Sequence, residues 1–495
     1  MEPEASPDNF PRKWWVFGTV AAGVLLATID GSIVNVALPT LVEEFDSSFA
    51  VVQWVALAYL LTLAALSLGV GRLGDVVGKK KIYVVGMAAF TLASVLCGLA
   101  PGIEWLIIFR VVQALGATMI LSLGAAILTE AFPARERGRA LGWIGTAVSV
   151  GVVTGPVVGG ILLSSLSWRS IFLVNLPVGI AGTLMAWRHV PATPPHPGQR
   201  FDLKGAVVLG GSLLAFALGL TMAQERGFED PLVIGLLVVS ALTGFGFIGI
   251  EKRHPHPMID LSLFSNRRLS VSITTGYVTF VTVSAFFLLM PFYLEGVLGL
   301  PTRQMGLVMA AGPFALGIVA PIAGNLADRF GVRGISIIGL TILTVAYFRL
   351  TGLSEDLTIP SYLTLAIPIG IGMGLFQSPN NVAIMSSVPP HFLGIGSGLL
   401  NLTRLLGQIT GAAALGTLFA SRVRSYSGGV LPPGGATSAS TAAQVAGLGD
   451  TYFIAGCLLA LATLFGWWAL RGDQTPRFGA EDRHQGSKTT RQNGK

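Results

Sequence analysis

The chain alternates between long apolar runs and short polar segments. Fourteen apolar runs are each near the roughly 20 residues that a helix needs to cross a bilayer. They are too long for the strands of a membrane barrel. The pattern therefore predicts an all-α membrane protein. The predicted spans are 14–38, 51–71, 82–100, 104–128, 140–163, 170–188, 205–223, 231–250, 270–291, 305–325, 335–353, 361–383, 395–420 and 450–470.

Composition agrees with a membrane location. Of the 495 residues, 52% are hydrophobic and 12% are charged, whereas about 25% are charged in a typical soluble domain. Cys97 and Cys457 lie in separate apolar runs, so we expect no disulfide and no metal site. The first run lacks a small-residue cleavage site, so we expect a retained helix rather than a signal peptide.

Lysine and arginine are distributed unequally between the two sides. If the N-terminus lies inside, six of the 32 fall on the outer side, Arg110 and Arg404 lie within the membrane, and 24 fall on the inner side. The positive-inside rule then predicts that both chain ends are cytoplasmic. We expect the membrane to be a plasma or bacterial inner membrane. This placement accounts for the net charge of +7 without a nucleic-acid partner.

A polar segment occurs twice at a fixed offset. GRLGDVVGKKK (71–81) and GNLADRFGVRG (324–334) share Gly, Leu, Asp and Gly at an offset of 253 residues. Such repetition predicts two equivalent halves, and paired halves in a membrane protein suggest a transporter with its substrate between them. We expect each segment to be a loop with Gly at both bends.

The position of the second copy predicts an insertion. The first copy follows the second span, so in a chain of two six-helix halves the second copy would follow the eighth. It follows the tenth span, so two additional spans lie between the halves, and 205–250 fits them. We also expect 421–449 to be an outer loop. The predicted domains are an N-terminal six-helix bundle (1–190), a linker with two inserted helices (191–268), a C-terminal six-helix bundle (269–472) and a cytoplasmic tail (473–495).

Two ionisable residues inside the membrane are candidates for proton coupling. Asp30 lies about 13 Å from Pro39, and Arg110 lies about 12 Å from Gly102, both measured from the outer face at 1.5 Å per residue. The acid and the base therefore reach one depth. Burial favours the protonated carboxyl, whereas a nearby Arg favours the ionised form, so moving the Arg would switch proton affinity. The alternative is a static ion pair that holds two helices together.

The thirteenth span carries a polar face. Asn401, Arg404 and Gln408 recur at helical spacing, so they share one side of the helix. Arg404 could meet an anionic or zwitterionic substrate in a water-filled cavity, or bind the carbonyl groups of a broken helix. Arg110 and Gln113 form a similar pair.

Further residues are candidates for lining a substrate pocket, although lipid contact or core packing would explain any single one equally well. These polar and aromatic candidates are Asn35, Gln53, Trp54, Tyr59, Gln113, Tyr277, Phe280, Phe287, Tyr293, Phe376, Gln377 and Asn381.

Two motifs suggest conformational roles. In GVVTGPVVGG (151–160), small residues share a face that allows close helix approach, and Pro156 predicts a kink; a hinge, a seal and plain packing all fit. In the repeated segment, Asp75 could cap a neighbouring helix while the lysines meet headgroups or acids. That contact would be a latch if it were made only when the inner side is closed. The alternative for Lys79 to Lys81 is that their charge serves only to orient the chain in the membrane. The latch residues are Gly71, Asp75, Gly78, Lys79, Asp328 and Arg329.

These stretches resemble the major facilitator superfamily, in its fourteen-helix drug:proton antiporter branch. GRLGDVVGKKK is similar to the loop signature after the second helix, although Val76 replaces the usual basic residue, which the second copy keeps as Arg329. IDGSIVNVALP (29–39) is similar to the first-helix signature of this branch, with Asp30 at its acidic position.

The resemblance also assigns residues in the fourth and fifth helices. In FRVVQALGA (109–117), Arg110 falls on the arginine associated with proton transfer. The residues that match the fifth-helix antiporter signature are Gly151, Gly155, Pro156, Gly159 and Gly160. The resemblance implies the major facilitator fold, with two six-helix bundles that rock to give alternating access.

We therefore expect a monomeric exporter that exchanges protons for a lipophilic or amphipathic small molecule, driven by the proton gradient with no cofactor. Alternatives are export of a lipid, an organic anion or a metabolite, and a non-transporting membrane sensor, which the lack of a sizeable soluble domain disfavours. An enzyme is disfavoured because no cluster of nucleophile, base and orienting residue is visible.

Overall fold

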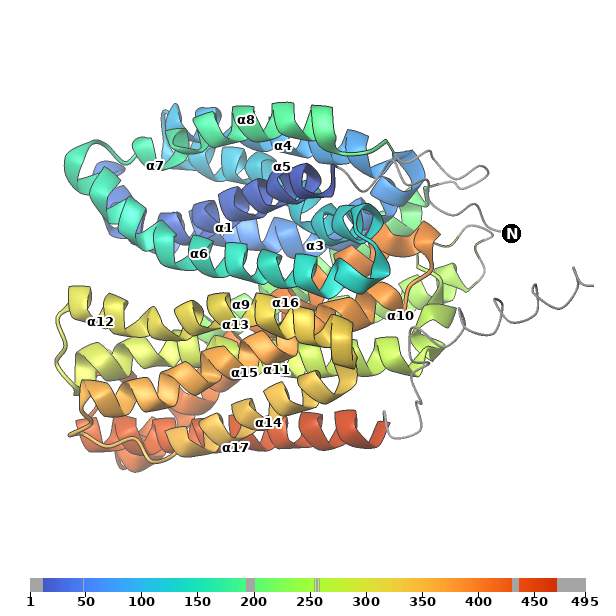
Figure 1. Ribbon diagram of the computed structural model, residues 1–495. Coiled ribbons are helices and arrows are strands. Elements are labelled where there is room, and N and C mark those ends of the chain that lie inside the picture. Colours follow the sequence, from blue (N-terminus) through green and yellow to red (C-terminus); the bar gives the residue numbers. More distant parts are fainter. Residues whose placement is uncertain are drawn as a thin grey trace, which may run out of the picture.

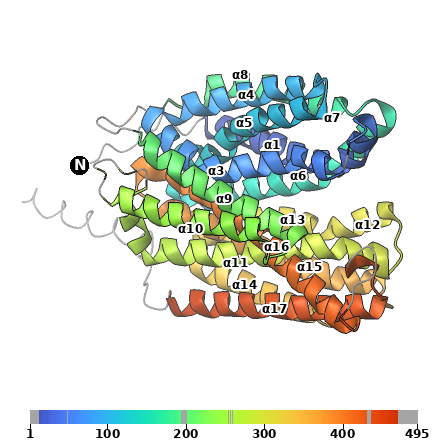
Figure 2. The ribbon, with the colours of Figure 1, turned by 180° about the vertical axis from the view of Figure 1, so that it is seen from behind.

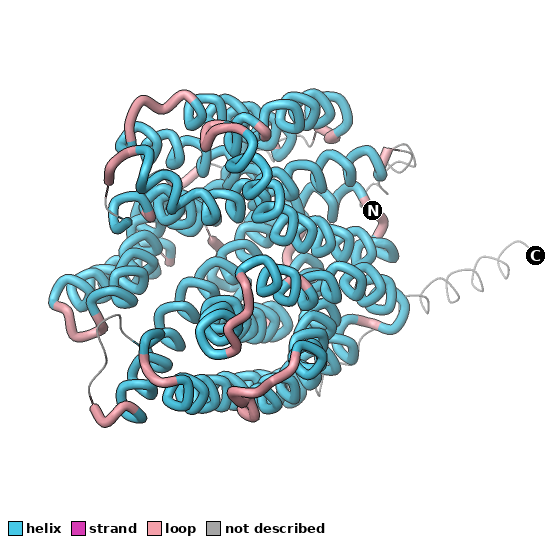
Figure 3. Tube along the Cα trace, turned by 90° about the vertical axis from the view of Figure 1, so that its left-hand side faces the viewer, coloured by secondary structure: helices cyan, strands magenta, loops and turns pink. Residues whose placement is uncertain are grey.

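The computed structural model describes residues 12–47, 49–192, 201–252, 254, 257, 259–429 and 436–469. Within these ranges the regular structure is helical, without strands, and Figure 3 shows the helices from one end of the molecule. The long helices of the first half and the insertion are α1 (Lys13–Glu44), α3 (Trp54–Val77), α4 (Lys79–Gly98), α5 (Ile103–Ala131), α6 (Arg137–Ser165), α8 (Asn175–His189), α9 (Leu203–Arg226) and α10 (Pro231–Glu251). Those of the second half are α11 (Arg267–Phe292), α13 (Ala311–Phe330), α14 (Val332–Leu350), α15 (Ile359–Ser386), α16 (Leu393–Tyr426) and α17 (Thr441–Ala469). Short elements are α2 (Phe49–Val52), η2 (Ala134–Glu136), α7 (Ser170–Leu173), η3 (Leu261–Ser265), η4 (Tyr293–Val297), α12 (Thr302–Met309), η5 (Pro390–Phe392) and η6 (Ala436–Ser438).

Each predicted span coincides with one long helix, extended in two cases by α7 or α12. In the described part of the chain, 13 helices are long and apolar enough to cross a membrane. The remaining long helix, α16, has 34 residues and contains Asn401, Arg404 and Gln408. The predicted all-α membrane fold is confirmed.

Two helical bundles lie side by side, and two further helices pack against them. Figure 1 shows α1 to α8 above α11 to α17, and Figure 2 shows α9 and α10 on the other side of the molecule. Each bundle has its own large apolar core, built around residues such as Phe90 and Leu123 in the first and Tyr347 and Phe376 in the second. The predicted domain boundaries stay predictions, and 473–495 lies outside the described residues.

One end of the molecule carries most of the basic residues, and we call it the basic end. It contains the start of α4 with Lys79 to Lys81, the start of α6 with Arg137 and Arg139, and the start of α11 with Arg267. The described chain also begins and ends there, at the start of α1 and the end of α17 (Figure 1).

The two repeated segments are helical rather than loops, so this prediction was wrong. Helix α3 continues to Val77 and α13 continues to Phe330. Only Gly78 (φ 106°) and Gly331 (φ 89°) separate each of these helices from the next, in a backbone region that favours glycine. The first glycine of each copy has a different role, because it lies where two helices meet.

Two seams join the bundles near the basic end, one between α3 and α16 and one between α13 and α6. A Cβ on Gly71 would collide with the carbonyl oxygen of Gly394, and a Cβ on Gly324 would collide with that of Gly138. Because α3 and α13 carry the repeated segment, the two seams are equivalent in the two-half arrangement. Glycine at these positions allows the backbones to touch.

The outer loop predicted for 421–449 is much shorter. Helix α16 extends to Tyr426 and α17 begins at Thr441, while 430–435 lie outside the described residues. The side-chain amide of Gln444 donates hydrogen bonds to the carbonyl groups of Thr437 (3.1 Å) and Ala439 (2.8 Å). These bonds order part of the Gly/Ser/Ala-rich stretch against the first turn of α17.

Candidate functional site

A charged pair lies in the interior of the first bundle. Asp30, in the middle of α1, is completely buried, and Arg110 of α5 is 1% exposed. Arg110 Nη1 lies 2.5 Å from Asp30 Oδ2. The two residues predicted to reach one depth are therefore in direct contact.

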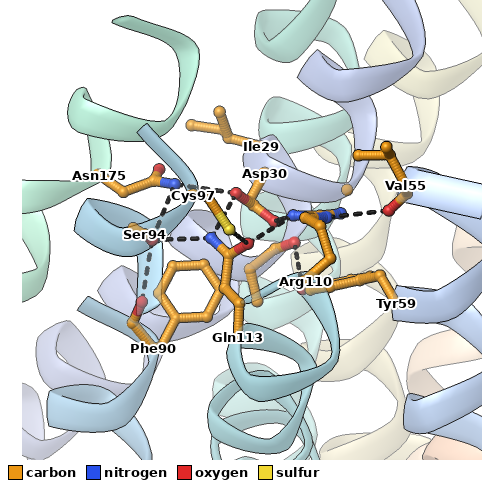
Figure 4. Close-up of polar contacts among 12 residues, drawn as sticks. Ile29, Asp30, Val55, Tyr59, Phe90, Ser94, Cys97, Arg110, Gln113 and Asn175 are labelled. Carbon is orange, nitrogen blue, oxygen red and sulfur yellow. Dashed lines mark hydrogen bonds and ion pairs between the residues drawn. The ribbon is translucent and has the colours of Figure 1, made fainter. Parts of the chain in front are cut away.

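Three amide or guanidinium donors surround the Asp30 carboxylate (Figure 4). Besides Arg110, Gln113 donates to Oδ1 at 2.8 Å, and Asn175 of α8 donates to the same oxygen at 2.9 Å. Charge-assisted hydrogen bonds of this kind are stronger than neutral ones. The carboxylate is therefore completely buried and hydrogen-bonded to donors from two helices, α5 and α8.

The guanidinium is equally constrained. Arg110 Nε donates to the carbonyl oxygen of Val55 at 3.0 Å, and Nη1 also donates to Gln113 Oε1 at 2.7 Å. Its Cζ lies 4.2 Å from the ring centre of Tyr59, a cation–π contact. The Tyr59 hydroxyl donates to the carbonyl oxygen of Ala27 on α1 at 3.2 Å. Helices α1, α3 and α5 thus meet at this one cation.

Part of this network was missed by sequence reasoning. Asn175 and Ser94 complete it, since the Ser94 hydroxyl accepts from Gln113 at 2.7 Å and from Asn175 at 3.4 Å. Cys97 contacts Gln113 Oε1 through its thiol at 3.6 Å. The available signal was a polar residue within an apolar span, which is costly unless paired. Gln113, a candidate for the substrate pocket, lies inside the network and is fully buried, and its role in substrate binding stays a prediction.

The small-residue face of α6 packs on α1 beside Asp30. Added Cβ atoms at Gly151, Gly155 and Gly159 would collide with α1 at Thr28, Ser32 and Ile33 respectively. The Ser32 hydroxyl also bonds the carbonyl oxygen of Gly151 at 3.2 Å. Gly160 has open space at its Cβ position and does not belong to this contact, and Pro156 is exposed.

A second polar cluster joins the bundles at the first seam. Asn401 donates to the hydroxyl of Ser67 on α3 at 2.9 Å, and Arg404 donates to Asn401 Oδ1 at 2.8 Å. Since α16 is continuous through Arg404, the alternative of a broken helix was wrong.

The other pocket candidates are scattered. Tyr293 is buried in the second core and donates to the carbonyl oxygen of Ser354 at 2.6 Å, and Phe376 belongs to the same core. Both pack in the core in this arrangement, and their assignment to a substrate pocket stays a prediction. Trp54 packs on the first core, and Tyr277 and Phe280 pack on the second. Gln53, Gln377 and Asn381 are half-buried, whereas Asn35, Phe287 and Gln408 are exposed.

Asp75 caps a helix of the opposite bundle. It accepts hydrogen bonds from the backbone N–H groups of Gly394 (2.8 Å) and Ile395 (3.1 Å) at the start of α16. No side chain of α16 itself serves as its cap, so Asp75 takes that role. Lys79 is buried between Asp75 (2.9 Å) and Glu130 (2.8 Å). A purely topogenic role for Lys79, or one in headgroup contact, was therefore wrong.

Asp328 makes the equivalent contact at the second seam. Its carboxylate accepts from the backbone N–H groups of Gly138 (2.8 Å) and Arg139 (2.9 Å) at the start of α6. Arg329 is exposed and contacts the ring of its neighbour Phe330, not the opposite bundle. Each bundle therefore caps one helix of the other.

Metal binding has no support in the described part of the chain, where no group of three or more His, Cys, Asp or Glu side chains could hold an ion.

Comparison with known proteins agrees with this architecture. The family model described as Major Facilitator Superfamily matches residues 20–412. The chain is 34% identical over 411 residues to the riboflavin transporter RibZ of Clostridioides difficile, covering 83% of this chain and 89% of the relative. It is 32% identical over 400 residues to the multidrug resistance protein Stp of Mycobacterium tuberculosis, covering 81% and 74%.

Among solved structures, the proton:xylose symporter XylE superposes with a TM-score of 0.65 over 92% of this chain and 95% of that one. At 14% identity this likeness concerns the fold alone.

Proposed function

Because the chain belongs to the Major Facilitator Superfamily of membrane transporters, we propose that it is a proton-coupled antiporter of the fourteen-helix drug:proton branch. It exports lipophilic or amphipathic small molecules by alternating access. It lies in the plasma or bacterial inner membrane as a monomer, with the basic end and both chain ends in the cytoplasm. It uses the proton gradient and no cofactor.

The observation that carries this proposal is Asp30, which is completely buried and accepts hydrogen bonds from three side chains. The carboxylate accepts from Arg110, Gln113 and Asn175, and protonation would remove the charge that attracts the Arg110 guanidinium, so proton uptake is favoured only when a donor withdraws. Proton uptake therefore requires α1 to move relative to α5 or α8, the helices that carry the donors. The glycine face of α6 beside Asp30 allows such a movement without loss of the seal.

This coupling has a direction. The basic end is held shut by Asp75 and Asp328, and the hydrogen bonds of Thr146 and Asn401 across the seams lie in the same half. We therefore assign this arrangement, as part of the proposal, to the outward-facing, deprotonated state of the transport cycle. Protonation of Asp30 releases Arg110 and favours the inward-facing state, in which cargo binding returns the proton.

The cargo class is supported by relatives named for multidrug resistance. A metabolite is the second candidate, because another relative is named a riboflavin transporter and Arg404 places a cation beside Asn401 at the interface between the bundles. Comparing cationic and anionic ligands on wild type and Arg404→Ala separates the two.

The test uses the purified full chain in liposomes with an imposed pH gradient. Ligands from a chemically diverse panel are first screened for release of protons from detergent-solubilised protein. For ligands that respond, Asp30→Asn should abolish proton-driven uptake and ligand-induced proton release. The matched control is Asp356→Asn, which makes the same chemical change at an exposed residue.

If Asp30→Asn inserts normally and still accumulates the ligand against its gradient, Asp30 is not the coupling site. If neither protein responds to any ligand class, the antiport proposal itself fails.

A further inference from the structure

A groove runs along the second seam, between α6 and α13. Its volume is about 810 Å³, within the roughly 300–1,000 Å³ range of small-molecule sites. Its walls are mostly apolar and include Val150 and Trp143 of α6 and Phe314, Ile318 and Ile322 of α13. These side chains are 40–69% exposed. In Figure 1 the two helices lie side by side on the near face of the molecule.

The equivalent seam is covered by the chain itself. At the junction of α3 and α16, Leu209 and Leu213 of α9 pack on an apolar cluster that contains Leu68 and Leu399. Figure 2 shows α9 and α10 along that side. The two inserted helices therefore fill one seam of a two-fold arrangement, while the other seam retains an apolar groove facing the bilayer.

The charge at one end of the groove indicates its occupant. Arg139 lines the groove at the basic end, and Arg135 and Arg329 are exposed close by. The nearby acids are engaged, because Asp328 bonds two backbone N–H groups and Glu136 pairs with Lys13 at 2.5 Å. This entrance attracts an anionic group and disfavours a lipophilic cation.

The length of the groove also fits a lipid. Its lining on α6 extends from Arg139 to Thr154, which is about 22 Å at 1.5 Å per residue. One leaflet contributes about 15 Å of hydrocarbon, half of the membrane core. The groove therefore extends from the headgroup level at the basic end to about the middle of the bilayer.

We propose that this groove holds one anionic phospholipid of the cytoplasmic leaflet, with its phosphate at Arg139 and an acyl chain between α6 and α13. The lipid takes the place at the second seam that α9 takes at the first. It contacts both bundles at once, so it stabilises the arrangement in which the basic end is closed.

The experiment reads one tryptophan of the full chain in vesicles. The protein is reconstituted in phosphatidylcholine with increasing fractions of phosphatidylglycerol whose chains are brominated, because bromine quenches indole fluorescence at short range. The chain has nine Trp residues, so the contribution of Trp143 is the difference between wild type and Trp143→Phe. Trp187→Phe, at a lipid-exposed Trp of α8 away from the groove, is the reference.

We expect half of the Trp143 fluorescence to be quenched at a fraction of brominated phosphatidylglycerol that is at least threefold lower than the fraction of brominated phosphatidylcholine needed for the same effect. Trp187 should show no such preference. Arg139→Gln should remove the preference while the backbone bond to Asp328 remains. Val150→Phe should fill part of the groove and so reduce the saturable part of the Trp143 quenching, which is the part that levels off as the fraction of brominated lipid rises. Val157→Phe is the control, because it lies two turns farther along the exposed face of α6 and outside the groove.

Three results would overturn the proposal. Equal, linear quenching of Trp143 and Trp187 by both lipids means ordinary bilayer contact. Relief of Trp143 quenching by tetraphenylphosphonium, but not by unbrominated phosphatidylglycerol, assigns the groove to a transported cation. Protection of Trp143 from both lipids, together with a cross-linked dimer, assigns the groove to a second copy of the chain.

Discussion

At the residue scale, Asp30 and Arg110 depend on each other. Removing one partner of a buried ion pair costs about 3–5 kcal/mol, because the other charge stays buried without compensation. Replacing both charges by neutral groups of similar shape costs much less. The stability of single and double variants therefore tests whether Asp30 and Arg110 interact in the folded protein.

We predict that Arg110→Leu lowers the midpoint of thermal unfolding more than the double variant Asp30→Asn/Arg110→Leu does. Asp30→Asn restores part of the loss because the amide carries no charge yet still accepts from Gln113 or Asn175. Scanning fluorimetry in one detergent at fixed pH gives the order of stability. Additive losses in the double variant would show that the two side chains do not interact.

At the element scale, α6 serves both bundles with different faces. One face packs on α1 through Gly151, Gly155 and Gly159. Another packs on α13, where Thr146 donates to the carbonyl oxygen of Gly317 at 2.6 Å. A displacement of α1 around Asp30, as the proposed transport cycle requires, would therefore reach the seam through this one helix.

We predict that Gly155→Val reduces proton-driven transport at least tenfold and lowers stability, since its Cβ would collide with the Ser32 hydroxyl. Overpacking of this kind costs about 1–3 kcal/mol. Gly160→Val, on the same helix with open space at its Cβ position, should behave like wild type. Equal loss in the two variants would mean that helix propensity, not the contact with α1, explains the effect.

At the scale of the whole molecule, the bundles are joined by two reciprocal caps. Asp75 holds the start of α16, and Asp328 holds the start of α6. A helix cap contributes about 1 kcal/mol. Asp75 contributes more, because its loss leaves Lys79 buried with Glu130 as its partner. The two caps share no residue, so their effects should add.

We predict that Asp75→Ala opens the basic end more than Asp328→Ala, and that the double variant opens it by the sum of the two free energies. Spin labels at Lys81→Cys and Ser386→Cys, exposed residues of opposite bundles in a Cys457→Ser background, report the distance distribution. Asp356→Ala is the control for loss of an exposed carboxylate. A basic end that stays closed in the double variant would exclude a latch at these residues.

Much of this architecture follows from the order of residues along the chain. Apolar runs define the spans, because in lipid each helix must satisfy its own backbone hydrogen bonds and expose apolar side chains. Asp30 and Arg110 stand out because a charge in such a run is costly without a role. Counting residues from the outer face also brings the two to one depth, since the rise per residue is constant.

Other features depend on how helices rotate and which of them meet. Asn175 reaches Asp30 across 145 positions, and Gly394 receives its cap from a residue 319 positions away. Tyr293 and Phe376 face the second core, whereas similar aromatic residues elsewhere are exposed. The groove between α6 and α13 exists because α9 covers only one of two equivalent seams. Hydropathy records how polar each position is, but contacts between distant helices are settled by packing in three dimensions.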